Sequence, residues 1–159
     1  MSERILVALD RSENALKAVE YIARTMSKLE DIQITLFDVI PRLPKFEFER
    51  GPHLPFLKDI ITELTVVRSQ RKTDMDHVFE MAKKKLIEAG VSEERIKIKC
   101  VEEKKGIAKD IVGEAIKGNY GTVILGRRGT SKTRDFYFGS VTNKVTSMLQ
   151  DRSIIIVGD

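Results

Sequence analysis

The sequence predicts an α/β fold, an open, doubly wound parallel sheet of five strands with helices on both faces. Five short apolar runs rich in β-branched residues recur along the 159-residue chain. Such continuous runs are typical of strands buried on both faces. Four stretches with apolar residues three and four positions apart separate the runs. Because strands and helical segments alternate, a sheet with right-handed crossovers is expected.

In the first half of the chain, strands are expected over residues 4–9 and 33–40. The apolar spacing between them predicts a helix with Ser12 as its N-cap and Glu13 in its first turn. Four prolines and Gly51 interrupt residues 41–55, so no regular structure is expected there. A long helical pattern then runs from Leu57 to a stop at Gly90. Residues 68–74 are polar all round and are expected to break that helix or to expose it.

In the second half, strands are expected over residues 96–101, 122–125 and 153–157, and helices over residues 107–116 and 141–149. No repeat and no linker divides the chain, so residues 1–159 are predicted to form one domain. Ligands of such sheets bind beyond the carboxyl ends of the strands. Asp10, Val39 and Gly126 follow or end predicted strands, and they can share one crevice with Gly139.

Composition argues against several classes of protein. The 28 basic residues are interspersed with 24 acidic ones, and only ten residues are aromatic, so a nucleic-acid-binding function is not expected. No apolar run is long enough to cross a bilayer, and no signal-peptide core follows the N-terminus. The single cysteine, Cys100, falls on the apolar side of an alternating run. We expect it to be a buried thiol in a cytoplasmic protein.

The most specific motif is Gly126-x2-Gly129-x9-Gly139-Ser140, which follows a predicted strand and opens a predicted helix. Glycines allow the backbone to approach an anion closely, and a helix N-terminus offers unpaired N–H groups and a positive dipole end. The spacing is neither a Walker A loop nor a dinucleotide-binding fingerprint. The motif predicts a phosphate site, and three ordinary turn and cap glycines are the alternative.

Other candidate residues have equally simple structural interpretations. Asp10 could cap the first helix, and Arg127 and Arg128 could be exposed loop residues. Lys132 and Arg134 could close over phosphates or remain in solvent. His53 and His77 are isolated, and no cluster has the spacing of a zinc site or a catalytic triad, so neither a protein-bound metal nor a catalytic residue is predicted.

Several segments together resemble the ATP-binding members of the universal stress protein family. The resemblance rests on the opening run that ends at Asp10 with Ser12 after it, on residues 36–40, on the glycine motif and on residues 139–145. It implies a strand order of 3-2-1-4-5 and a homodimer built on the final strands. The final strand departs from the family pattern because no proline precedes it.

The resemblance also implies a ligand, ATP with Mg²⁺, and a set of binding residues. Asp10, the backbone of Val39 and Leu125 would lie at the adenine and ribose end. Gly126, Gly129, Gly139 and Ser140 would hold the phosphates, with the start of the helix continuing behind them. The complete expected set is Ala8, Leu9, Asp10, Val39, Leu125, Gly126, Arg128, Gly129, Gly139, Ser140, Val141 and Thr142.

Three functions follow from this sequence. The first is a regulatory, stress-response protein that holds ATP and changes its shape or its protein partners with occupancy. The second is a slow ATPase or phosphotransferase. The third is a dimeric scaffold without nucleotide, against which the glycine motif argues. Because Asp135 is the only acidic residue between the motif's second and third glycines, slow or absent turnover is expected.

Overall fold

The computed structural model describes residues 2–12, 14–43, 55–127 and 138–158, which include a single five-stranded sheet. All strand pairs are parallel and the order is β3-β2-β1-β4-β5, which confirms the predicted fold class. The strands are β1 (Glu3–Ala8), β2 (Ile32–Ile40), β3 (Ile96–Glu102), β4 (Thr122–Gly126) and β5 (Ser153–Val157). The predicted strands differ from these by at most one residue at an end.

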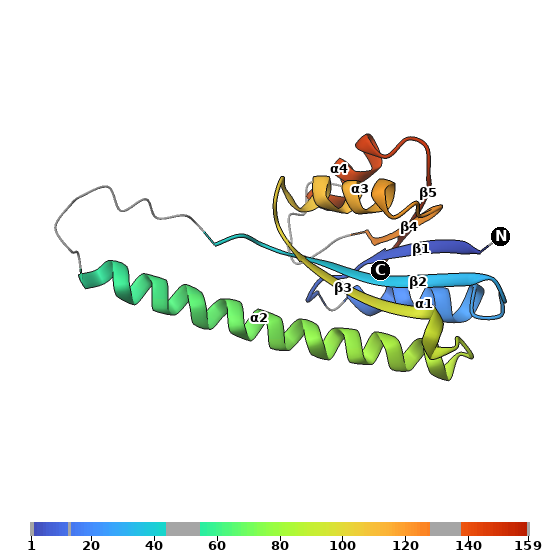
Figure 1. Ribbon diagram of the computed structural model, residues 1–159, viewed down its shortest axis with the longest axis horizontal. Coiled ribbons are helices and arrows are strands. Elements are labelled where there is room, and N and C mark those ends of the chain that lie inside the picture. Colours follow the sequence, from blue (N-terminus) through green and yellow to red (C-terminus); the bar gives the residue numbers. More distant parts are fainter. Residues whose placement is uncertain (1, 13, 44–54, 128–137, 159) are drawn as a thin grey trace.

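Helices cover both faces of the sheet (Figure 1). One face carries α1 (Ala15–Thr25) and α2 (Pro55–Glu88), and the other carries α3 (Ile107–Lys117) and α4 (Ser140–Met148). Each face has its own apolar cluster. Phe79 and Leu86 of α2 pack in the first cluster, and Ile111 and Val145 pack in the second. A single turn of 3-10 helix, Glu93–Arg95, leads into β3.

Helix α2 is continuous, so residues 68–74 do not break it; the other expectation, that this stretch is exposed, holds for four of its seven residues. Its 34 residues make a rod of about 51 Å at 1.5 Å per residue. The side chains that α2 buries fully, from Met75 to Leu86, lie in its second half. Its first half projects past the sheet (Figure 1). Its three partly buried residues, Arg68, Arg71 and Asp74, pair with groups at or just after the strand ends.

Two local predictions are also wrong. Helix α1 begins at Ala15 after Asn14, so Ser12 is not its N-cap. Cys100 is exposed rather than buried. Alternation along β3 identifies the side to which Cys100 points, but β3 is an edge strand, and at that edge the side chain is left uncovered. Among the described residues, no helix is both long and apolar enough to span a membrane.

Candidate functional site

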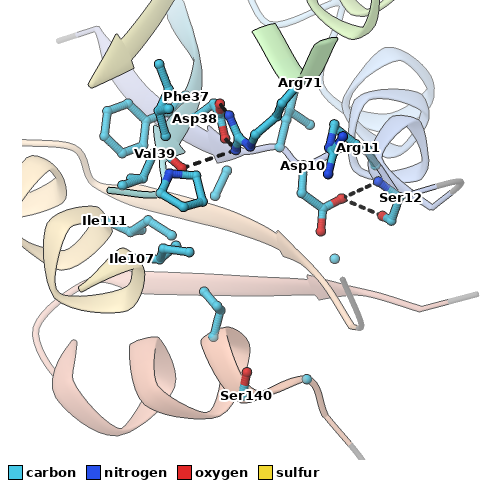
Figure 2. A pocket seen from close by; sticks show the side chains of 18 of the residues that line it. Asp10, Arg11, Ser12, Phe37, Asp38, Val39, Arg71, Ile107, Ile111 and Ser140 are labelled. Atoms are coloured by element: carbon cyan, nitrogen blue, oxygen red, sulfur yellow. Dashed lines mark hydrogen bonds and ion pairs between the residues drawn. The ribbon is translucent and has the colours of Figure 1, made fainter. Parts of the chain in front are cut away.

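A cavity of about 560 Å³ opens at the carboxyl ends of β1, β2 and β4. Helix α2 forms one wall, the first turns of α3 and α4 form the opposite wall, and the turn after β1 closes one end. Figure 2 shows Asp10 and Ser12 across the cavity from Val39, Ile107 and Ile111, with Ser140 farther along. The cavity therefore has an apolar part beside α3 and a polar part between the β1 turn and α4.

Ten of the twelve predicted site residues line this cavity. They come from three strand ends and one helix start: Ala8, Leu9, Asp10, Val39, Leu125, Gly126, Gly139, Ser140, Val141 and Thr142. The other two, Arg128 and Gly129, lie outside the described residues, as do Lys132 and Arg134. The ten converge because parallel strands end at the same edge of the sheet.

Asp10 does not cap α1, which was the alternative interpretation of this residue. Its Oδ1 accepts hydrogen bonds from the Ser12 backbone N–H, at 2.8 Å, and from the Ser12 hydroxyl. These bonds close the turn after β1. Within the described residues, Oδ2 of Asp10 carries no hydrogen bond, so one carboxylate oxygen at the cavity wall can still accept one.

The start of α4 is a candidate anion site, and the backbone dihedral angles there are ones that any residue can adopt. Gly139 has a φ of −63°, so its conformation does not require glycine. Its N–H donates to the Arg127 carbonyl at 2.8 Å and is therefore occupied. The next three N–H groups, of Ser140, Val141 and Thr142, belong to the first helical turn and have no acceptor within the helix. No described residue accepts from these three N–H groups, and they lie at the positive end of the helix dipole.

Thr142 has a supporting position. Its side chain is buried, and its hydroxyl donates to the carbonyl of Gly126 at 2.8 Å. This bond ties the first turn of α4 to the last residue of β4. Thr142 therefore fixes the distance between two parts of the glycine motif, and its hydroxyl proton is already in use.

At the other end of the cavity, the backbone of Val39 is directed past the end of β1. Along a strand, successive residues turn their N–H and C=O groups to opposite neighbours. The Phe37 carbonyl accepts the Leu9 N–H, on the β1 side, and the Ile40 carbonyl accepts the Glu103 N–H, on the β3 side. Val39 therefore faces the β1 side, where β1 has already ended at Ala8. Its N–H and C=O form a polar edge on the cavity.

A buried ion pair lies beside that edge. Arg71 of α2 donates from both terminal nitrogens to the two carboxylate oxygens of Asp38, each at 2.9 Å. Its Nη2 also donates to the Val39 carbonyl at 3.2 Å (Figure 2). The Asp38 side chain is only 3% exposed and that of Arg71 is 14% exposed. The pair is therefore largely removed from solvent, while Arg71 forms part of the cavity wall.

Two further ion pairs tie the same side of α2 to neighbouring strand ends. Arg68 pairs with Glu102 at the end of β3, and Asp74 pairs with Arg11 after β1, at 3.3 Å. The helix residues involved are spaced by three, so they lie along one side of α2. These pairs account for three of the charged residues in the polar stretch, which the sequence predicted to be either a break in the helix or an exposed part of it.

The Asp38 carboxylate also affects Cys100, which lies opposite it on β3. The thiol of Cys100 approaches Asp38 Oδ2 at 3.9 Å. Partial desolvation at the strand edge, followed by the negative charge of Asp38, raises the pKa of Cys100 to about 11. The thiol is exposed, but at neutral pH it stays protonated and is a poor nucleophile.

The sequence did not predict that Asp38, Arg68 and Arg71 belong to this site. A signal was present in the sequence, because Asp38 is the one charged residue in the strand of residues 32–40. A charge inside a strand buried on both faces needs a partner. Its identity could not be read from the sequence, because Arg71 lies 33 residues away and several other cations were available.

Comparison with known proteins identifies the family. The sequence model of the universal stress protein family matches residues 1–147. The chain belongs to this family. No curated protein gives a significant sequence match.

Several solved structures share the fold, universal stress proteins among them. Hypothetical protein MJ0577 has a TM-score of 0.72 at 21% identity, over 100% of this chain and 97% of that one. UspA from Lactobacillus plantarum has a TM-score of 0.71 at 18% identity, over 98% and 97%. A family member from Arabidopsis thaliana, with AMP bound, has a TM-score of 0.64 at 16% identity, over 98% and 91%. Two more structures, each 15% identical, are complexes with cAMP and with dAMP.

Proposed function

We propose that this universal stress protein binds an adenine nucleotide, ATP with Mg²⁺, in the cavity at the carboxyl ends of β1, β2 and β4, and that occupancy regulates its shape or its protein partners. The observation that carries the proposal is the pairing of two polar ends in one cavity. The Val39 backbone edge lies at one end, and at the other lie the first N–H groups of α4, which no described residue accepts. Family structures with AMP, dAMP or cAMP support the same ligand class.

The cavity offers complementary chemistry for each part of the ligand. Val39, Leu125 and Ile107 provide apolar surface for a flat base. The Val39 N–H and C=O match the acceptor N1 and the donor 6-amino group of adenine. Oδ2 of Asp10 can accept a ribose hydroxyl. The first turn of α4 with Ser140 can receive phosphate oxygens, as helix N-termini commonly do.

Magnesium would be held mainly by the phosphates. Within the described residues, no three metal-ligating side chains come together. The cavity lining contains the carboxylates of Asp10 and Asp38, and Arg71 already binds both oxygens of Asp38. Mg²⁺ commonly retains several waters and binds through substrate phosphates, so this environment suits a metal that arrives with ATP. The metal would then neutralise phosphate charge without a dedicated protein cage.

The two edges of the sheet support a homodimer through β5. The β3 edge carries Lys97 and Lys99, and charged side chains of this kind prevent edge-to-edge pairing. The β5 edge presents partly exposed apolar residues, Ile154–Ile156 among them, and no charge. Ile155→Lys should therefore yield monomeric or insoluble protein, as measured by sedimentation. Native protein that is monomeric at tens of micromolar would contradict this arrangement.

Titration calorimetry with ATP and Mg²⁺ tests the nucleotide site directly. Binding with a Kd in the micromolar range or below is expected. Gly139→Val should abolish it, because the side chain would occupy the space of the phosphate oxygens, while φ of −63° allows valine without backbone strain. Ser140→Ala should weaken binding by about 1 kcal/mol, the worth of one hydrogen bond. Ser147→Ala, which removes a hydroxyl near the other end of α4, is the matched control.

The outcomes separate the candidate functions. Absence of binding at millimolar nucleotide would favour the dimeric scaffold. Normal ATP affinity in Gly139→Val would show that the phosphates lie elsewhere.

A further inference from the structure

The guanidinium of Arg71 forms an unusual bridge at the end of β2. It joins the middle of a helix to a buried carboxylate and, through Nη2, to a main-chain carbonyl that faces the cavity. Asp38 and Val39 are adjacent, so a single side chain holds both residues. The exposed pairs of α2, such as Lys85 with Glu20 at 3.0 Å, make no such main-chain contact.

Resting on the nucleotide-binding function proposed above, we propose that Arg71, held by Asp38, is a positioning residue that makes the site prefer adenine over bases with a 6-carbonyl group. Adenine presents an amino donor at C6 and an acceptor at N1. Hypoxanthine and guanine present the reverse, a carbonyl at C6 and an N–H at N1. The edge of Val39, one acceptor and one donor, complements adenine only while its carbonyl keeps its orientation.

The Val39 carbonyl needs another group to hold it because the pairing of β1 with β2 ends before Val39. On the β3 side, the strand continues to be paired, because the Ile40 carbonyl accepts the Glu103 N–H at 2.8 Å. On the cavity side, β1 has ended, so no strand holds the polar groups of Val39. Arg71 supplies the missing donor. A carbonyl oxygen has two lone pairs, so the Arg71 bond leaves one of them for the 6-amino group of the base.

Asp38 orients Arg71 and does not contact the base itself. Both of its oxygens receive guanidinium N–H groups at 2.9 Å, and its side chain is almost fully buried. The bidentate geometry matters because an arginine fork fixes its own plane as well as its distance. A lysine at position 71 would keep the positive charge but could not span the two oxygens and the Val39 carbonyl together.

The test compares ATP with ITP, which differs from ATP in carrying hypoxanthine. Calorimetric titrations with Mg²⁺ would use the native protein, Arg71→Lys, and the double variant Asp38→Leu/Arg71→Met. The native protein should prefer ATP. In both variants, the ATP-to-ITP affinity ratio should fall roughly tenfold, which corresponds to about 1.4 kcal/mol. The double variant Lys85→Met/Glu20→Gln removes an α2 ion pair far from the cavity and should keep the native ratio.

A purely structural role for Arg71 would change stability and leave the ratio constant. An unchanged ratio in folded Arg71→Lys protein therefore overturns this inference while nucleotide binding stands. If the native protein binds neither ATP nor ITP, the proposed function fails and this inference fails with it. Circular dichroism establishes that each variant is folded, and Arg71→Lys decides the question if the apolar double variant does not fold.

Discussion

Removal of the Arg71 side chain should be far more damaging than removal of any surface cation. In Arg71→Met, the Asp38 carboxylate would remain at a site where 3% of its side chain is exposed, with no cation to compensate it. Breaking a buried ion pair in this way typically costs about 3–5 kcal/mol. In Asp38→Leu/Arg71→Met, both charges are gone, and such apolar replacements are often neutral or stabilising. The double variant should therefore be more stable than the single one.

Urea unfolding at one fixed protein concentration measures this difference. With a slope of about 2 kcal/mol per molar urea, a loss of about 4 kcal/mol lowers the midpoint by about 2 M. Lys85→Met is the matched control on the same helix. Its ion pair with Glu20 is exposed, with side-chain exposures of 36% and 55%. Exposed pairs contribute about 0–1 kcal/mol. If Arg71→Met cost no more than Lys85→Met, the reasoning from burial would be refuted.

Four further outcomes are expected. Gly118→Ala should destabilise the protein by about 1–3 kcal/mol, because a Cβ there would lie 2.2 Å from the Tyr120 ring. Gly113→Ala on α3 should instead stabilise the protein by about 0.5–1 kcal/mol, because a Cβ there would meet no other atom. Equal unfolding midpoints for the two variants would contradict both predictions. Iodoacetamide should label Cys100 slowly at pH 8, with a rate that rises about tenfold per pH unit towards its pKa of about 11. ATP turnover with Mg²⁺ should stay below about 1 s⁻¹, the lower end for kinases, as a phosphate-release assay can measure.

Patterns of neighbouring residues predicted the elements of the fold, while contacts between distant residues were not predicted. The β-branched run at residues 122–125 is read correctly as a strand because its own side chains determine its burial. The order of the strands came from the family resemblance, since periodicity does not indicate which strands are neighbours. Cys100 was misplaced for a related reason. Alternation reports the face of a strand, but only the sheet order reveals that β3 is an edge.

The candidate site likewise has one part that local sequence motifs predict and one part that depends on contacts between distant residues. The ten residues found at the cavity follow short motifs at strand ends and at one helix start, and these positions are local features of the sequence. The wall formed by α2 depends on tertiary pairing. A polar stretch at residues 68–74 is equally compatible with a loop, an exposed helix turn or a set of ion pairs. The structure combines the last two: the stretch is helical and largely exposed, and Arg71 within it pairs with the buried Asp38, 33 residues earlier in the chain.

The three ion pairs that α2 makes beside the cavity follow the order of the strands beneath them, and they differ in what they contribute. Arg68, Arg71 and Asp74 pair with the ends of β3, β2 and the turn after β1, respectively. The two outer pairs are exposed and contribute little to stability. The central pair is buried and bidentate. The apolar seam that anchors α2 begins at Met75, whereas the helix residues that line the cavity are all N-terminal to it, with Leu64 and Val67 the farthest. Near the cavity, the position of α2 therefore rests mainly on Arg71, the same side chain that holds the Val39 carbonyl.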